Sequence, residues 1–191
     1  MKSVFIFCFG LLLLTGCAQL ARDESCVNFG AADYCLQPST GVPPYAATRS
    51  VTLRHPRGVE KLIVSLEVDA AGVRMAGLTP FGRRLFSIRL DNGQAPVVAS
   101  DVPVDARLVL AGLQFADWPL ERVQQAARGA EARIAQQDRE AQSPRSFRDG
   151  EQTLMTATCE GGARPICRRV RLRYPTLDME LLIESLDASA S

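Results

Sequence analysis

Cysteine and histidine are the residue types from which this 191-residue chain could build reactive chemistry, and it has six cysteines but one histidine, His55. One histidine, placed before Pro56 at the end of a predicted strand, gives neither a zinc site nor an evident catalytic triad. The cysteine spacings contain no CxxC pair, and no G-x-S-x-G, P-loop or H-E-x-x-H motif occurs. Glu67 and Asp69 share one strand face, where paired carboxylates are usually solvated. We therefore expect no enzymatic activity, no metal and no cofactor.

The first residues have the features of an export signal. An apolar run over residues 4–14 follows Lys2, and it is shorter than the roughly 20 residues that a membrane-spanning helix needs. A basic start, a short apolar run and then small residues are typical of a secretory signal. The run ends in Leu14, Thr15, Gly16 and Cys17, which resembles the bacterial lipobox. The alternative is an ordinary signal peptide with an incidental cysteine.

The lipobox resemblance implies a lipid anchor at Cys17. Residues 1–16 would be removed, and Cys17 would carry diacylglycerol and an amide-linked acyl chain such as palmitate. Each buried methylene contributes about 0.8 kcal/mol, so several chains together anchor a protein stably. Ala18 stands where an aspartate signals retention in the inner membrane. The resemblance therefore implies an outer-membrane lipoprotein on the periplasmic face.

Charge gives no reason to expect nucleic-acid binding. Lys2 is the one charged residue in 1–16, so the remaining chain has 21 basic and 21 acidic residues. Its length suits one domain with a core, and we expect a monomer.

Four cysteines remain after Cys8 is removed and Cys17 is lipidated: Cys26, Cys35, Cys159 and Cys167. Export places them in an oxidising compartment, where disulfides persist. Three pairings are possible. We favour Cys26–Cys35 and Cys159–Cys167, because the partners of each pair are close in sequence.

The composition divides the chain into a tether, a domain and a short tail. Residues 17–47 are rich in small residues and include Pro43-Pro44, so we expect a lipidated tether with a small disulfide loop. Residues 48–186 should form the folded domain, and 187–191 a tail.

Apolar residues alternate with polar ones on both sides of the domain's middle, which predicts half-buried strands. The expected inner face comprises Leu62, Val64, Leu66, Val68, Phe86, Ile88, Leu90, Val170, Leu172 and Tyr174. Between these strands, residues 104–115 predict a helix. Asp117-Trp118-Pro119 then predicts the start of a second, longer helix that continues to Ser143-Pro144, because apolar residues recur every three or four positions. The order of strands, helices and strands indicates an α+β fold, with helices covering one face of a curved antiparallel sheet.

The segment VRMAGLTPFGRRLFSIRL, residues 73–90, resembles the outer-membrane lipoprotein receptor LolB and its relatives, which share a strand, a Pro-x-Gly turn and an amphipathic strand. The likeness continues at residues 113–126 and 168–185. A second resemblance is to uncharacterised bacterial lipoproteins, some encoded beside aryl-polyene or fatty-acid-type genes. These have LT.FG..LF followed by LQ...WP, as this chain has at 78–86 and 113–119.

The resemblance implies a LolA/LolB-like fold, an unclosed β-barrel whose open face is covered by helices. It implies a function in which acyl chains, or the acyl chains of lipidated cargo, are held in the barrel and delivered to outer-membrane lipid. A LolA-like periplasmic carrier is the implied partner. The membrane-contact loop would comprise Leu78, Pro80, Phe81 and Gly82, with Phe81 at its tip. The alternative is that Phe81 folds back onto the core.

The inner-face residues, together with Phe115 and Trp118, have two interpretations. They line a lipid cavity with Phe115 and Trp118 as a plug, or they form an ordinary core. The first interpretation predicts a carrier or receptor for acyl chains. The second predicts an envelope assembly or structural lipoprotein that has a filled core and binds a protein partner.

Overall fold

The structure is a computed structural model that describes residues 24–102, 105–138, 140, 142–164 and 166–186. The expected signal, Cys17 with its lipobox, and the tail at 187–191 lie outside the described residues.

The described residues form strands, two helices and a 3-10 turn. The strands are β1 Cys26–Asn28, β2 Asp33–Cys35, β3 Tyr45–His55, β4 Gly58–Val68, β5 Gly72–Leu78, β6 Arg84–Asp91, β7 Val97–Ser100, β8 Ala127–Arg128, β9 Ala132–Gln136, β10 Arg145–Asp149, β11 Gln152–Ala163, β12 Ile166–Tyr174 and β13 Met179–Ser185. The helical elements are α1 Ala106–Asp117, α2 Leu120–Gln124 and the 3-10 turn η1 Pro175–Leu177.

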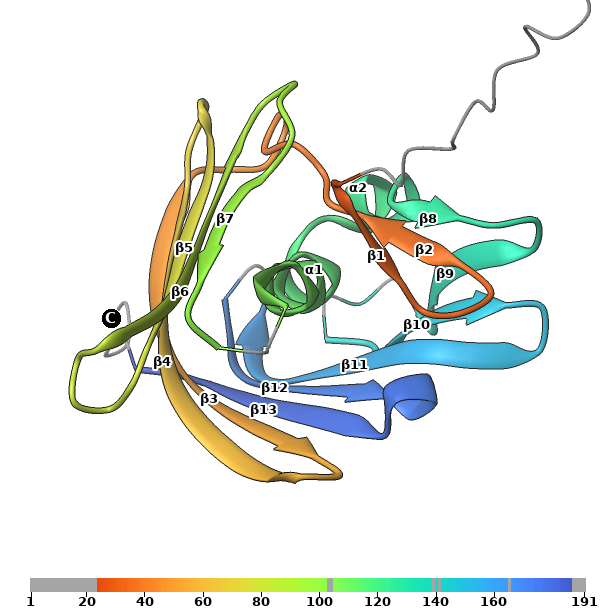
Figure 1. Cartoon of the computed structure of the whole chain (residues 1–191). Coiled ribbons are helices and arrows are strands. Elements are labelled where there is room, and N and C mark those ends of the chain that lie inside the picture. The colour runs from red at the N-terminus through yellow and green to blue at the C-terminus, as the bar shows by residue number, and fades with distance from the viewer. Residues whose placement is uncertain (1–23, 103–104, 139, 141, 165, 187–191) are drawn as a thin grey trace, which may run out of the picture.

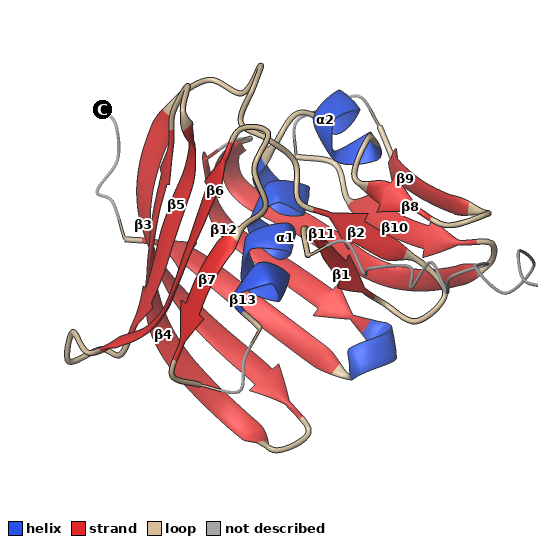
Figure 2. Cartoon of the chain, turned by 45° about the horizontal axis from the view of Figure 1, so that its top comes forward, coloured by secondary structure: helices blue, strands red, loops and turns tan. Residues whose placement is uncertain are grey.

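One long antiparallel sheet wraps around α1 (Figure 1). Its ten strands follow the order β7-β6-β5-β4-β3-β13-β12-β11-β10-β9, so β7 and β9 are its two outer strands. They do not pair with each other, and the sheet stays unclosed, as predicted. A smaller sheet, β1-β2-β8, packs beside α1 on the open side of the curve (Figure 2).

The alternation predicted for the strands is confirmed. On β4, Leu62, Val64, Leu66 and Val68 are buried, while Ser65 and Glu67 between them are exposed. The equivalent residues of β6 and β12 are buried as well. Because side chains alternate across a strand, this pattern places one continuous apolar face on the inside of the curve.

Helix α1 occupies the space inside the curve. Asp105 caps its first turn, where Asp105 Oδ1 accepts a hydrogen bond of 2.9 Å from the Arg107 backbone N–H. Every residue of α1 except Arg107 is buried. A helix that is apolar on all sides is stable only when other elements surround it, so α1 is the centre of the core.

Two arginines hold the carboxyl end of α1. Arg145 Nη1 donates to the carbonyl oxygens of Phe115 at 2.9 Å and Trp118 at 2.6 Å. Arg164 Nε donates to the carbonyl oxygen of Ala116 at 2.5 Å. The last carbonyls of a helix have no partners within the helix, and positive charge there is favourable. Strand β10 and the β11–β12 turn therefore supply what this buried helix end needs.

A buried ion pair lies at the same helix end. Arg49 Nη1 of β3 is 2.8 Å from Asp117 Oδ2, and both side chains are almost fully buried. Burial raises the pKa of Asp117 to about 6, against the opposing effect of Arg49 and, more weakly, Arg164 and Arg145. The pair therefore joins β3 to α1 at the expense of desolvating two charges.

Both disulfides join the pairs that the sequence favours. Cys26–Cys35 links β1 to β2, and Cys159–Cys167 links β11 to β12 across their hairpin.

Residues 24–47 differ from the expected tether, because they pack with the domain. Val27, Phe29 and Tyr34 are buried, and the Phe29 ring stacks on Tyr174 with centroids 5.9 Å apart. Gln37 is also fixed, since its N–H donates to Gln114 Oε1 of α1 at 2.9 Å. This segment is otherwise rich in small and polar residues, and a few large side chains attach it to the core.

The long second helix is a wrong prediction. Helix α2 ends at Gln124, and the chain continues as β8 and β9. Gly129 has φ of +147°, which glycine adopts far more readily than other residues, and it separates the two strands. Ile134 lies in β9 opposite Phe147 of β10. The expected layer of helices over the open face is therefore not seen among the described residues, and α1 lies inside the curve.

Removing one partner of the buried ion pair should destabilise the protein strongly. We expect Arg49→Met to lower the free energy of unfolding by about 3–5 kcal/mol, because Asp117 is then a buried charge without its partner. The double variant Arg49→Met/Asp117→Leu should recover most of that loss. Arg171→Met, which removes an exposed pair with Glu180, serves as control and should change it by about 0–1 kcal/mol. Denaturant unfolding measures all three, and equal losses in the single and double variants would contradict the expectation.

Asp117 should also give the stability a particular pH dependence. Its raised pKa means that the folded chain holds a proton between about pH 4 and pH 6 that the unfolded chain has released. The contribution of Asp117 to the free energy of unfolding therefore falls as the pH rises through this window. Denaturant unfolding across it should show a smaller fall for Asp117→Asn than for the unaltered chain. An identical pH profile for the two proteins would disprove this assignment.

Candidate functional site

The inner face that the sequence offers as a cavity is packed against α1. The residues predicted to line it are all 4 % exposed or less: Leu62, Val64, Leu66, Val68, Phe86, Ile88, Leu90, Val170, Leu172 and Tyr174. Gly112 of α1 makes the closest approach, since a Cβ there would lie 2.2 Å from Tyr174 Oη and 2.8 Å from Leu172 Cδ1. These side chains and α1 form one apolar cluster. The structure therefore places the predicted lining residues in a core that α1 fills.

Phe115 and Trp118 belong to this core as well. Phe115 is fully buried and meets Tyr34 edge to face, with centroids 6.3 Å apart. Trp118 is 1 % exposed, and its Nε1–H donates to Tyr45 Oη at 3.1 Å. Both are therefore packing residues in this structure.

Open space remains at one end of the curve, between β3, the start of α1 and η1. This end cavity measures about 560 Å³, within the usual range of about 300–1,000 Å³ for small-molecule sites. Leu53, Leu108, Leu177 and Met179 give it an apolar wall. Its other lining residues are His55, Pro56, Arg57, Glu60 and Asp105.

The polar rim of the end cavity comes mainly from the β3–β4 turn. His55 Nδ1 accepts a hydrogen bond from the Arg57 backbone N–H at 3.3 Å, and His55 Nε2 lies 3.4 Å from Glu60 Oε1. The Arg57 side chain is exposed. An apolar wall with a charged rim suits an amphiphile, whose chain enters while its polar head stays at the rim.

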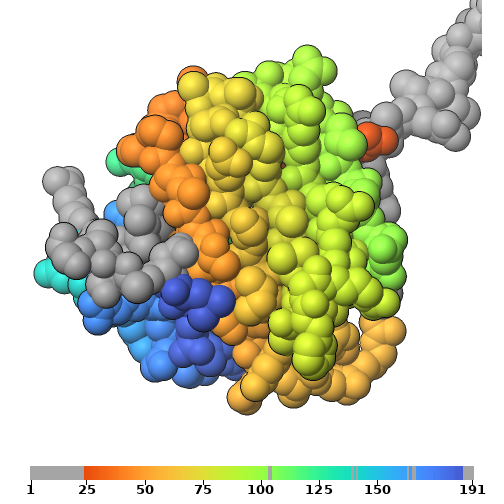
Figure 3. Space-filling view, turned by 90° about the vertical axis from the view of Figure 1, so that its left-hand side faces the viewer, coloured from red at the N-terminus to blue at the C-terminus, as the bar shows by residue number. Residues whose placement is uncertain are grey.

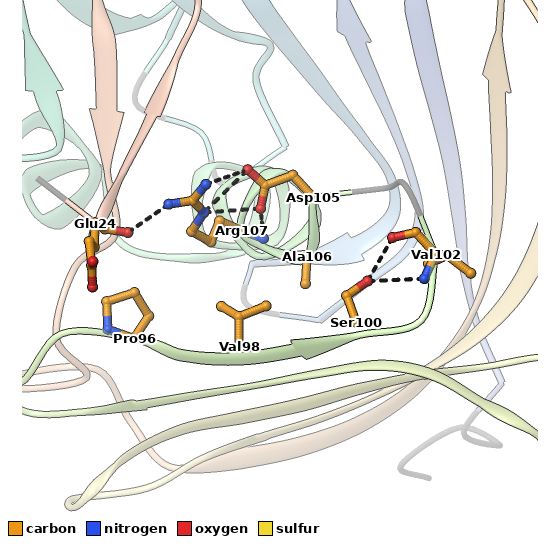
Figure 4. Close-up of a pocket in the computed structure, with 8 residues that line it drawn as sticks. All are labelled: Glu24, Pro96, Val98, Ser100, Val102, Asp105, Ala106 and Arg107. Carbon is orange, nitrogen blue, oxygen red and sulfur yellow. Dashed lines mark hydrogen bonds and ion pairs between the residues drawn. The ribbon is translucent and has the colours of Figure 1, made fainter. Parts of the chain in front are cut away.

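A second pocket lies between β7 and the first turn of α1 and measures about 580 Å³ (Figure 4). Its residues are Glu24, Pro96, Val98, Ser100, Val102, Asp105, Ala106 and Arg107. Figure 4 shows Arg107 between Asp105 and Glu24: its guanidinium pairs with the Asp105 carboxylate and donates to the Glu24 carbonyl oxygen at 3.0 Å. This contact fixes the beginning of the described chain to α1.

The predicted membrane-contact loop is the β5–β6 turn, and Phe81 at its tip is 98 % exposed. Thr79 closes the turn, because its carbonyl oxygen accepts from the Gly82 N–H at 2.9 Å and its N–H donates to the Arg83 carbonyl oxygen at 2.8 Å. Gly82 has φ of +84°, which glycine permits. Pro80 and Gly82 are exposed and Leu78 is half-buried. The alternative in which Phe81 folds onto the core is not the conformation found.

The two carboxylates that the sequence places together near the end of β4 are engaged in ion pairs. Glu67 and Asp69 both pair with Arg74 on the outer face. Over the described ranges, no three His, Cys, Asp or Glu side chains converge as metal ligands. Neither α1 nor any other described helix has the length and apolar content to cross a bilayer.

The sequence did not identify the wall of the end cavity. Leu53, Leu108, Leu177 and Met179 come from four separate elements, and each has an ordinary place in its own pattern. The one local signal was Pro175-Thr176-Leu177, a break between two strands that leaves Leu177 half-buried at the mouth.

No curated protein matches the chain. A crystal structure described as an outer membrane lipoprotein-sorting protein domain from Vibrio parahaemolyticus is similar at 8 % identity and a TM-score of 0.39, over 74 % of this chain and 83 % of that one. A TM-score of this size does not establish a shared fold. The association with aryl-polyene genes stays a prediction. The family is defined by sequence: residues 46–187 match "Protein of unknown function (DUF3261)", and the chain belongs to that family.

Proposed function

We propose that this protein binds one acyl chain of a lipid or of lipidated cargo in the end cavity and passes it to a membrane. The observation that carries the proposal is the cavity itself, an apolar wall of Leu53, Leu108, Leu177 and Met179 beneath a charged rim. Its volume suits a single chain better than a whole lipid. Because α1 fills the rest of the interior, binding is proposed at this end only.

The exposed Phe81 turn supports the membrane part of the proposal. The β5–β6 turn and the β3–β4 turn, which borders the cavity, lie at the same end of the sheet (Figure 1). Phe81 is 98 % exposed at the turn tip, a position from which its ring can enter an apolar layer. Phe81 would then enter the bilayer surface from the same end of the sheet as the turn that borders the cavity.

The location and partners follow from the sequence and are part of the proposal. Lipid on Cys17 would hold the domain at the periplasmic face of the outer membrane. A LolA-like periplasmic carrier would deliver the cargo to a monomeric, non-catalytic receptor.

A second function is favoured by a different observation. The close approach of Gly112 to Tyr174 and Leu172 gives the protein a filled core. A non-catalytic envelope assembly protein that binds a protein partner would need no more interior space than this.

Charge placed on the cavity wall should weaken acyl-chain binding. Leu177→Lys and Met179→Lys put an ammonium group in an apolar wall that is half-buried, and should weaken uptake of a fluorescent fatty acid at least about tenfold. The measurement is a fluorescence titration of chain 18–191, exported so that both disulfides form, with native mass spectrometry for lipid that co-purifies.

Val97→Lys is the matched control, because Val97 is 70 % exposed on β7 and does not line the end cavity. It should bind as the unaltered chain does. A ligand-free protein without saturable uptake would overturn the proposal and leave the filled-core alternative.

Phe81 should contribute to membrane binding without affecting the cavity. We expect Phe81→Glu to lower partitioning onto phosphatidylcholine vesicles about tenfold or more, because a buried aromatic side chain is replaced by a charge. Fatty-acid uptake in solution should be unchanged. Vesicle co-sedimentation measures the first effect, with Val97→Glu as control. Partitioning of Phe81→Glu equal to that of the control would show that the turn does not touch the membrane.

A further inference from the structure

Exposed cations without carboxylate partners gather at the end of the sheet that carries the Phe81 turn. The two hairpin segments concerned, residues 54–61 and 79–84, are here called the basic end. Their five cations are Arg54, Arg57, Lys61, Arg83 and Arg84, and all five side chains are exposed. Within the described part of the chain, none lies within 4.0 Å of a carboxylate. Glu60 is the one carboxylate of these two segments, and it lies against His55.

Several exposed arginines elsewhere on the sheet have carboxylate partners. Arg74 pairs with Glu67 and Asp69, and Arg89 Nη2 lies 2.7 Å from Asp91 Oδ2. Arg169 Nη2 lies 2.9 Å from Glu184 Oε1. The chain is close to neutral as a whole, so the basic end is a local excess of positive charge.

Apolar side chains project from the same two hairpins. Val59 is 61 % exposed on β4 beside the β3–β4 turn, and Phe81 is 98 % exposed. Arg54 lies directly opposite Val59 in the ladder, so the two share a face of the hairpin. Lys61 lies two residues beyond Val59 on that face. Figure 3 shows both turns at the lower end of the molecule.

From this combination we propose that the basic end is a membrane-binding surface selective for anionic lipid headgroups. The proposal rests on the proposed function for the contact made by Phe81, and adds the β3–β4 hairpin and the lipid charge. Phe81 and Val59 enter the headgroup region, and the five cations lie over it. Cations near a negative membrane surface each strengthen binding about fivefold.

The exposed apolar tips favour a bilayer over other polyanions. A nucleic acid or an acidic protein region would be attracted by the cations, but it offers nothing for Phe81 and Val59 to enter. A membrane offers both an anionic surface and an apolar layer beneath it. The end cavity opens on the same side, since His55, Pro56 and Arg57 line its mouth.

Vesicles of two compositions test the proposal. Chain 18–191 is sedimented with phosphatidylcholine vesicles and with vesicles that also contain phosphatidylglycerol, at low and high salt. The triple variant Arg54→Gln/Arg57→Gln/Lys61→Gln should lose on the order of a hundredfold in partitioning onto the anionic vesicles. Its partitioning onto neutral vesicles should change little, and high salt should reduce the difference between the two proteins.

A triple variant on β12, Arg168→Gln/Arg169→Gln/Arg171→Gln, is the matched control. It removes three exposed cations from the part of β12 that lies away from the β3–β4 turn. This variant should bind anionic vesicles nearly as the unaltered chain does. Equal partitioning of the unaltered chain onto both compositions, or an equal loss in the two triple variants, would overturn the inference. Phe81→Glu separates the two proposals. If it binds as the unaltered chain does while the β3–β4 triple variant fails on anionic vesicles, the apolar contact is refuted and the charge selectivity stands.

Discussion

The structure depends on one helix that is buried on every side. Helix α1 gives up almost all of its contact with water, so its apolar surface needs partners in all directions and its polar ends need partners of their own. The curved sheet supplies the first requirement. Asp105 meets the second at the amino end, and Arg145 and Arg164 meet it at the carboxyl end. Segments distant in sequence are therefore fixed to one another through α1.

Features with a local cause were predictable from the sequence, whereas features made by distant segments were not. The alternation from Leu62 to Val68 lies within one strand, and the apolar run of α1 lies within one helix. Each can therefore be recognised from consecutive residues. The prediction of one long helix from Leu120 to Ile134 was wrong, because five apolar residues spaced by three or four also fit a short helix followed by strands. Gly129 provides the turn between those strands. The packing of residues 24–47 against the domain was not predicted. Phe29 and Tyr34 are isolated aromatic residues in the sequence, and their partners, Tyr174 and Phe115, lie far along the chain.

The same limit applied to the candidate site. The exposed position of Phe81 was predicted, because a proline, an aromatic residue and a glycine between two strands form a local signal of a turn. The end cavity was not, because its wall joins β3, α1, η1 and β13. A filled interior with a cavity at one end also changes what a ligand could be. A single chain that leaves its polar group outside would suit this cavity, whereas a bulky lipid would require α1 to leave the core.

The contact between Arg107 and the Glu24 carbonyl oxygen has a geometric consequence for an anchored protein. If Cys17 carries lipid, as the sequence predicts, only about seven residues separate the anchor from a point fixed on α1, and a fully extended chain of that length spans roughly 25 Å. A flexible tether of about 30 residues would let the domain sample a much larger volume. The shorter tether would instead keep the domain close to the bilayer at a high effective concentration. Even weak headgroup contacts would then be enough to orient the domain.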